Sequence, residues 1–285
     1  MKQSQLPFLI DLHGRTAVVT GAGGVLCSQF SHALAACGAQ VALLDKKQEA
    51  AQAVADEIAA DGGIARAYQA NVLDKDMLES VHQEILHDFG PCDILINGAG
   101  GNHPSATTTQ EFYDPKQIGT DTITFFDLDK ESISFVFNLN YLGTLLPTQV
   151  FAKEMANRPG SSIINISSMN AFTPLTKIPA YSGAKAAVSN LTQWLAVHFA
   201  GVGIRVNAIA PGFFATAQNR ALLFTEDGQL TERSHKIINQ TPMGRFGERH
   251  ELIGALLFLV SPEASGFITG IILPVDGGFS AYSGV

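Results

Sequence analysis

The sequence predicts an α/β protein with one parallel β-sheet, of about seven strands, and helices on both faces of the sheet. Along nearly the whole chain, short apolar runs typical of buried strands alternate with longer segments of helical periodicity, which is the order of a doubly wound fold. The hydrophobic share of 46% suits a sheet that is covered on both faces. A length of 285 residues is common for a single α/β domain, so we expect residues 1–285 to form one domain.

The first expected strand, residues 16–20, runs into a glycine-rich turn. Gly21-Ala-Gly-Gly-Val-Leu-Cys27 follows the strand and leads into a helix with an apolar face. A glycine turn at the start of a helix lets the backbone approach a pyrophosphate, whose charge is met by free N–H groups and by the helix dipole. The residues expected at this phosphate site are Gly21, Gly23, Gly24, Val25 and Leu26. The alternative is a strand–helix turn that binds no ligand.

The second expected strand, residues 40–44, is followed directly by Asp45. A carboxylate at this position can accept hydrogen bonds from the ribose hydroxyls of an adenosine. It would repel a 2′-phosphate by on the order of a few kcal/mol, although Lys46 and Lys47 soften the repulsion. We therefore expect NAD as cofactor rather than NADP.

The elements that follow continue the alternation. We expect helices at residues 47–60, 74–89 and 248–260, the second with Asp74 as its N-cap, and strands at residues 64–69, 93–96, 163–166, 204–210 and 271–274.

Residues 101–129 form a polar, threonine-rich stretch without a helical or strand pattern. Loops of this length inside compact domains are usually functional lids or disordered segments. We interpret the stretch as an insertion at the rim of the active site, with Asn102 and His103 nearest the cofactor. For its far half, residues 111–122, a surface excursion without function fits equally well.

Two expected helices are apolar nearly all round. The first covers residues 130–157, and the second carries Tyr181. One face of such a helix can cover the sheet, while the other needs a second apolar surface. The two helices therefore predict a homo-oligomer.

The strongest chemical signal is the set Ser168, Tyr181 and Lys185. Tyr181 and Lys185 are four residues apart, so a helix places both side chains on one face. An ammonium this close favours the phenolate, and we expect the pKa of Tyr181 to lie below that of a free tyrosine. Ser168 follows the strand at residues 163–166, and open α/β sheets place their ligands at the carboxyl ends of strands. The alternative is an exposed helical Tyr–Lys pair without function.

Together these motifs resemble the short-chain dehydrogenase/reductase family, over nearly the whole chain from the Gly14 region to Gly278. The resemblance implies a Rossmann-type fold and hydride transfer between a nicotinamide and a secondary alcohol or ketone. It implies that Tyr181 exchanges the substrate proton, that Lys185 lowers its pKa and bonds the nicotinamide ribose, and that Ser168 bonds the reacting oxygen. Asn140 would complete the proton relay.

The same resemblance implies further cofactor contacts and shows where this chain departs from the family. The implied contacts are Asn71, Val72, Asn97, Gly98, Ala99, Pro211, Gly212, Phe214 and Thr216. The family pattern T-G-x-x-x-G-x-G has glycines where this chain has Val25 and Cys27. Gly98 stands where the family's N-N-A-G has its second asparagine, and Asn71 stands where the family commonly has aspartate.

The candidate substrate residues are polar, which favours a hydroxylated and carboxylated substrate over a steroid or an acyl chain. They are Asn102, His103, Asn170, Lys177, Asn219, Arg220 and Arg245. An arginine is the natural partner of a carboxylate, although Arg220 and Arg245 are equally well interpreted as ordinary solvated charges. We expect residues 213–247 to form the flap that binds the substrate.

Several stretches look, at their non-catalytic positions, like the members of the family that interconvert D-mannonate and D-fructuronate. They are T-G-A-G-G-V-L-C-S, the G-G-N-H-P start of the insertion, I-N-I-S-S-M-N-A-F-T-P-L-T-K-I-P-A-Y-S-G-A-K and V-D-G-G-F-S-A-Y-S-G-V. The alternatives are a gluconate 5-dehydrogenase-like or other polyol or sugar dehydrogenase, a 3-oxoacyl-carrier reductase, and a non-catalytic NAD-binding regulator. Only Val25 and Cys27 favour the regulator.

Composition narrows the partners to small molecules and other copies of the chain. A net charge of −8 argues against nucleic acid and anionic membranes, and no stretch is apolar enough to span a bilayer. The start of the chain lacks the pattern of a signal peptide, and three cysteines without metal spacing indicate reduced thiols in the cytoplasm. The histidines show no ligand spacing, so we expect no metal. The resemblance implies a homotetramer, with a homodimer as the alternative.

Overall fold

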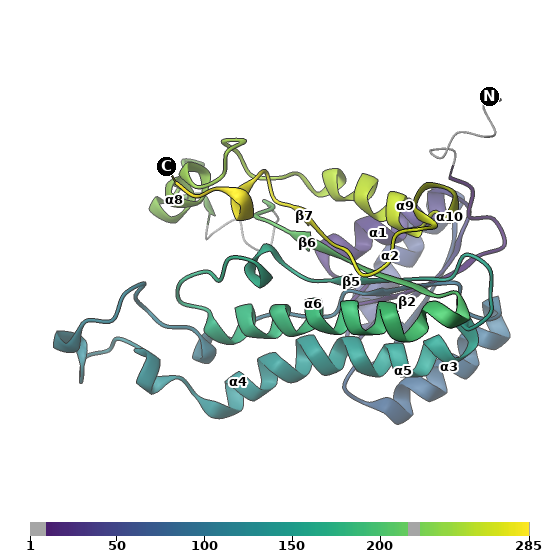
Figure 1. The fold of residues 1–285 in the computed structure, drawn as a ribbon, viewed down its shortest axis with the longest axis horizontal. Helices are drawn as coiled ribbons and strands as arrows, with labels where there is room; N and C mark the ends of the chain where they lie inside the picture. The colour runs from purple at the N-terminus through teal and green to yellow at the C-terminus, as the bar shows by residue number, and fades with distance from the viewer. Residues whose placement is uncertain (1–9, 216–222, 285) are drawn as a thin grey trace.

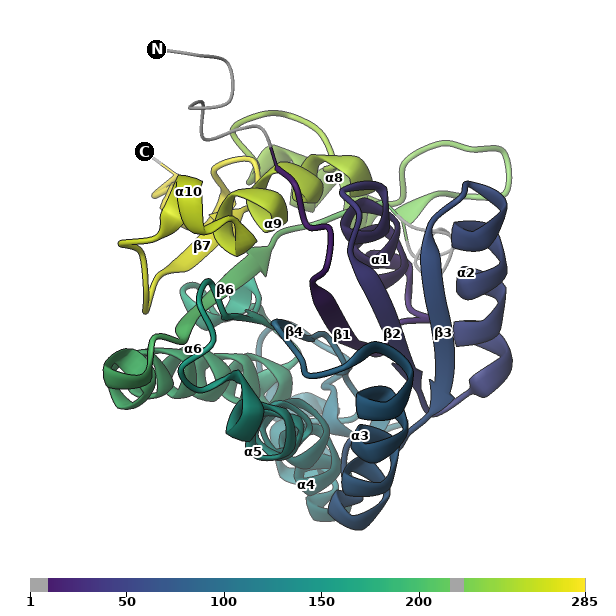
Figure 2. The same ribbon diagram turned by 90° about the vertical axis from the view of Figure 1, so that its right-hand side faces the viewer.

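Seven strands form one parallel sheet in the order β3-β2-β1-β4-β5-β6-β7 (Figures 1 and 2). The computed structural model describes residues 10–215 and 223–284. The strands are β1 (Thr16–Thr20), β2 (Gln40–Asp45), β3 (Ile64–Gln69), β4 (Ile94–Asn97), β5 (Ser162–Ile166), β6 (Arg205–Pro211) and β7 (Ile272–Val275). The predicted α/β fold with a doubly wound parallel sheet is confirmed, and each predicted strand lies within two residues of its observed bounds.

Helices cover both faces of the sheet (Figure 2). They are α1 (Val25–Ala36), α2 (Gln48–Ala60), α3 (Lys75–Phe89), α4 (Lys130–Phe137), α5 (Gly143–Met155), α6 (Pro179–Phe199), α8 (Glu232–Asn239), α9 (Ile253–Val260) and α10 (Pro262–Ser265). None of the helices in the described ranges is both long enough and apolar enough to cross a membrane.

The side chains of β1 show how the two helix layers are held. Ala17 and Val19 pack in one core cluster with α1, α2 and α9. Val18 points to the opposite face and packs with α3, α5 and α6. Because successive side chains of a strand face opposite sides, a strand covered on both faces is expected to be mostly apolar. All five residues of β1 are buried.

The sequence predicted one continuous helix over residues 130–157, and that prediction is wrong in detail. A π-helical turn, Asn138–Leu142, separates α4 from α5. Within it the Nδ2 group of Asn140 donates to the carbonyl of Val136 at 2.7 Å and to that of Gly101 at 2.7 Å. A side chain that bonds a carbonyl one turn earlier competes with the backbone hydrogen bonds of the helix, and π turns occur mostly as single turns inside α-helices, as here.

Residues 101–129 contain no regular helix or strand, as predicted, and project beyond the end of the sheet (Figure 1). The segment holds three short 3-10 turns, Pro104–Ala106, Pro115–Gln117 and Phe125–Asp127. The backbone N–H of Thr108 donates to the carbonyl of Lys177 at 2.8 Å, which ties the segment to the loop before α6.

The strand order places a ligand crevice between β1 and β4. The chain runs outward from β1 through β2 to β3 and then returns to β4 on the other side of β1. At such a switch point the loops after the two strands diverge toward opposite faces, which leaves a crevice outside their carboxyl ends.

Candidate active site

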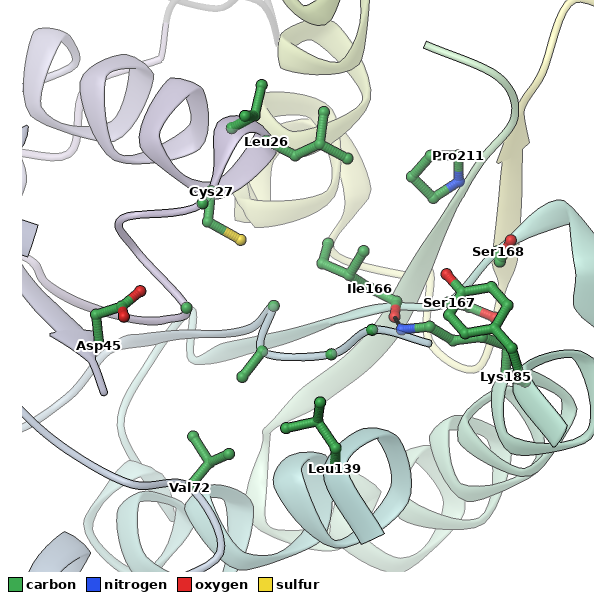
Figure 3. A pocket seen from close by; sticks show the side chains of 18 of the residues that line it. Leu26, Cys27, Asp45, Val72, Leu139, Ile166, Ser167, Ser168, Lys185 and Pro211 are labelled. Atoms are coloured by element: carbon green, nitrogen blue, oxygen red, sulfur yellow. Dashed lines mark hydrogen bonds between the residues drawn. The ribbon is translucent and has the colours of Figure 1, made fainter. Parts of the chain in front are cut away.

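A cavity of about 580 Å³ lies at the carboxyl ends of the strands (Figure 3). The loops after six strands line it. The lining includes Gly21 and Gly24 after β1, Asp45 and Lys46 after β2, Asn71 and Val72 after β3, Gly98 to Gly101 after β4, Ser167 and Ser168 after β5, and Pro211 to Phe214 after β6. Tyr181 and Lys185 of α6 complete one end.

The end of the cavity next to α1 suits a pyrophosphate. Gly21 has a φ of 66°, and a side-chain carbon there would lie 3.0 Å from the backbone of Ala99. Helix α1 begins at Val25 without a side-chain cap and without an acidic residue in its first turn, within the described residues. Its first N–H groups are therefore available to an anion, and the helix dipole favours one.

Asp45 lies at the same end and is held by backbone N–H groups. Its Oδ2 accepts from the N–H of Gly23 at 3.0 Å, and its Oδ1 accepts from that of Lys47 at 2.9 Å. Each carboxylate oxygen has a further lone pair for a ribose hydroxyl. Gly23 itself does not line the cavity, and its N–H positions Asp45.

Two departures from the family pattern compensate each other across the cavity floor. A side-chain carbon built on Gly98 would overlap the sulfur of Cys27. The thiol therefore occupies the room that the missing side chain of Gly98 leaves. Burial raises the pKa of Cys27 to about 12, so the thiol is neutral beside the phosphate site.

Ser168, Tyr181 and Lys185 meet at the opposite end of the cavity. Ser168 begins the turn after β5, and its Oγ accepts from the N–H of Asn170 at 3.2 Å. Tyr181 lies in the first turn of α6, and its phenol lies next to the side chain of Ser168. Pro179 at the start of α6 suits a helix N-terminus, because its missing N–H would have no partner there.

The prediction that the pKa of Tyr181 lies below that of a free tyrosine is wrong. Burial raises the pKa of Tyr181 above its ordinary value, and the side chain of Ser168 offsets this only in part. The ammonium of Lys185 lies 5.7 Å from the centre of the tyrosine ring and donates to the carbonyl of Ile166 at 2.7 Å (Figure 3). Burial also lowers the pKa of Lys185 to about 8. Helical spacing placed the two residues on one face but did not determine where the ammonium points.

Asn140 does not line the cavity but supports its wall. Its side chain is buried, accepts from the N–H of Gly101 at 3.2 Å and donates to the carbonyl of the same residue. A side-chain carbon on Gly100 would lie 2.6 Å from Oδ1 of Asn140 and 3.1 Å from Nζ of Lys185. The two side chains therefore meet next to Gly100.

One cofactor residue expected from the family lies outside the cavity wall. The Nδ2 group of Asn97 donates to Thr148 and to Asn165, both at 2.9 Å, in the buried layer between the sheet and the helices. Its role there is to join β4, β5 and α5. Gly21, Gly24, Val25, Leu26, Asp45, Asn71, Val72, Gly98, Ala99, Pro211, Gly212 and Phe214 do line the cavity, and Thr216 lies outside the described residues.

Several lining residues were not identified from the sequence. They are Cys27, Lys46, Ala70, Gly100, Gly101, Leu139, Ile166, Ser167 and Phe213. Most are chain neighbours of residues that were identified, so the loop after each strand would have been a better unit of prediction than single positions.

The substrate candidates are dispersed. Asn102 donates to Thr107 at 3.0 Å, and His103 caps a short turn with its ring edge-on to Phe135. Asn170 is buried. Lys177 lines a second cavity that shares Phe213 with the first. Asn219 and Arg220 lie outside the described residues.

The expected substrate role of Arg245 is not supported. Its guanidinium forms a bidentate ion pair with Glu251, at 2.6 and 2.8 Å. It lines a separate cavity with Gly247 and residues 274–278. The pair with Glu251 offsets the charge of Arg245, which weakens its attraction for a second carboxylate.

Comparisons with known proteins agree with this geometry. The family model for short chain dehydrogenases matches residues 15–226. A crystal structure from Haemophilus influenzae, of a protein provisionally named a D-mannonate oxidoreductase and holding bound NAD, is 62% identical. It superposes with a TM-score of 0.94 over 96% of this chain and 98% of the other.

Two further relatives cover almost the full chain. An oxidoreductase of Bacillus subtilis, UxuB, is 53% identical over 98% of this chain and 100% of its own. The 5-keto-D-gluconate 5-reductase of Escherichia coli is 33% identical over 95% of this chain and 97% of its own. With the family's glycine turn, serine, tyrosine and lysine gathered around one cavity, the chain belongs to the short-chain dehydrogenase family.

Proposed function

We propose that this protein interconverts D-mannonate and D-fructuronate with NAD as cofactor. The observation that supports this most is one cavity with a pyrophosphate turn and Asp45 at one end and Ser168, Tyr181 and Lys185 at the other. The substrate is suggested by the 62% identity to the Haemophilus influenzae protein that is provisionally named for D-mannonate. A bound NAD supplies the hydride acceptor, or NADH the donor.

Side chains of this protein transfer the proton that accompanies the hydride. Tyr181 exchanges it with the substrate oxygen, and Ser168 hydrogen-bonds that oxygen and the phenol. Lys185 is the one ammonium that lines this end of the cavity among the described residues, so it stabilises the phenolate when the proton leaves. Asn140 holds Gly101, and with it the wall beside the lysine. General acid–base help of this kind typically contributes about 10² to 10⁴ in rate.

Asp45 supports NAD over NADP. Its carboxylate faces the cavity where the adenosine ribose of a dinucleotide lies in this fold. A 2′-phosphate there would meet a negative charge at short range. Lys46 also lines this end and reduces the discrimination without reversing it, because the carboxylate is fixed by two backbone N–H groups.

The second candidate function is reduction of 5-keto-D-gluconate, favoured by the 33% identity to the Escherichia coli reductase. The test follows NADH absorbance with D-fructuronate, 5-keto-D-gluconate and an acetoacetyl thioester in turn. We expect the highest kcat/KM for D-fructuronate. A higher value for 5-keto-D-gluconate would select the second function, and NADH binding without oxidation of any carbonyl would select the non-catalytic regulator.

We also propose that the chain assembles as a homotetramer, or a homodimer, through α4 and α6. Both helices leave large apolar side chains exposed, namely Phe135 and Phe137 on α4 and Trp194 and Val197 on α6. We regard residues 1–285 as one cytoplasmic domain, with residues 101–129 as a rim insertion and residues 213–247 as the substrate flap.

A further inference from the structure

A second cavity, of about 520 Å³, shares the lining residue Phe213 with the first. The insertion contributes Glu111, the loop before α6 contributes residues 175–177, and α8 contributes the opposite wall. Phe213 lines both cavities, and Lys177 of the second lies four residues before Tyr181 of the first, so the two cavities are neighbours.

The lining of this cavity carries an excess of positive charge. Three cations, Lys177, Arg233 and Lys236, face two carboxylates, Glu111 and Glu232. Lys236 is paired with both carboxylates, at 3.2 Å and 3.5 Å respectively. Its pair with Glu111 joins the insertion to α8 across the cavity.

Lys177 and Arg233 remain without an ion pair or a side-chain hydrogen bond within residues 10–215 and 223–284. Most other arginines near the sheet are held by carboxylates or carbonyls, as Arg245 is by Glu251. Two unpaired cations that line one cavity are suited to an anionic group of a ligand.

The backbone of Lys177 supplies an independent observation. Its φ is 73°, a left-handed conformation that a lysine rarely adopts and that costs about 1–3 kcal/mol. The conformation is stabilised by the hydrogen bond from Thr108 to its carbonyl. Strain of this kind is typical of functional sites, and here it fixes a lysine four residues before Tyr181.

We propose that the second cavity binds the carboxylate of the substrate, with Lys177 and Arg233 as its counter-ions. This rests on the proposed function, because it assumes a sugar acid whose carbonyl is reduced beside Tyr181. A short chain that reacts at Tyr181 and extends past Phe213 brings its far end to the two cations. Specificity for an acid over a neutral sugar then comes from this cavity rather than from Arg245.

The test compares substrates that differ only in the carboxylate. D-fructose has a hydroxymethyl group where D-fructuronate has the carboxylate, and L-sorbose stands in the same relation to 5-keto-D-gluconate. The variants are Arg233→Gln and Lys177→Asn, because asparagine tolerates the left-handed backbone and removes the charge. Lys153→Gln, an exposed lysine at the end of α5, is the matched control.

Each variant is expected to lower kcat/KM for the acid by about 10- to 100-fold, the range for losing a charge-assisted hydrogen bond, and to leave the neutral ketose nearly unchanged. The Lys153 control should change neither. Binding of D-mannonate and of D-mannitol to the NADH complex, measured by calorimetry, gives a readout without turnover. Only the affinity for D-mannonate should fall.

Equal losses for acid and neutral substrate, or a wild-type protein that does not prefer acids, would overturn the carboxylate site. Failure of the proposed function gives a different result. If the wild type reduces 5-keto-D-gluconate but not D-fructuronate, the proposed substrate is wrong, and the same variants are then compared on 5-keto-D-gluconate and L-sorbose. Unchanged discrimination in that pair would overturn the inference as well.

Discussion

The complementarity between Cys27 and Gly98 can be measured as a coupling energy. In the wild type, a methyl group added at Gly98 would overlap the sulfur of Cys27. It would also lie 3.0 Å from the carbonyl oxygen of Thr20 and 3.7 Å from Cβ of Cys27. If Cys27 is first shortened to alanine, the overlap with sulfur disappears and the 3.7 Å contact between the two Cβ atoms is ordinary packing.

We expect Gly98→Ala alone to destabilise the protein by about 1–3 kcal/mol, the usual cost of overpacking, and to weaken NAD binding. In the Cys27→Ala background the same substitution should cost about 1–3 kcal/mol less. The tight approach to Thr20 is present in both backgrounds, so its contribution cancels in the double-mutant cycle. The coupling energy therefore reports the sulfur contact alone.

Urea unfolding of the four proteins measures the free energies of unfolding, and NADH fluorescence measures cofactor affinity. Cys92 provides the control, because it is also buried but does not line the cavity. The cycle of Cys92→Ala with Gly98→Ala should be additive within about 0.5 kcal/mol. If the cycle with Cys27 is equally additive, the two departures from the family pattern do not compensate each other.

Four further predictions concern the cofactor, the proton and the assembly. Tyr181→Phe should reduce kcat by at least about 10²-fold while NADH fluorescence shows unchanged binding, and near-normal turnover would contradict its role. Asp45→Asn keeps an acceptor oxygen but removes the charge. The ratio of kcat/KM for NADP to that for NAD should therefore rise about 10-fold or more in steady-state kinetics. An unchanged ratio would show that Asp45 does not determine the preference for NAD. Burial lowers the pKa of Lys185 to about 8 from 10.5. Between these pH values the unfolded chain binds more protons than the folded one. The lysine therefore lowers the free energy of unfolding by about 3 kcal/mol at pH 7. Lys185→Met should therefore raise the free energy of unfolding at pH 7, with the gain shrinking as pH rises through 8 to 10.5, and urea titrations that show a pH-independent gain would contradict this assignment. Val197 is 81% exposed on α6, so Val197→Glu should shift the mass measured by light scattering toward the monomer with little loss of Tm, and an unchanged mass would place the interface elsewhere.

The sheet and its helices could be predicted because the evidence for them is local. Strands such as β1, β2 and β4 show short apolar runs, and the helices show the period of 3.6 residues. The same holds for the gathering of Gly21, Ser168, Tyr181 and Lys185 around one cavity, because it depends on spacing along the chain and on positions at strand ends.

Only the tertiary structure decided how these side chains are oriented and which of them are free to bind. The ammonium of Lys185 donates to the carbonyl of Ile166, and the thiol of Cys27 lies next to Gly98. Arg245 forms an ion pair with Glu251, whereas Arg233 has no ion pair among the described residues. Each of these contacts joins segments that are distant in the sequence, or depends on which of several chemically similar groups lies near the side chain. Spacing along a chain determines which face of an element a residue occupies, but the direction and the partner of a side chain are determined by what packs against that face.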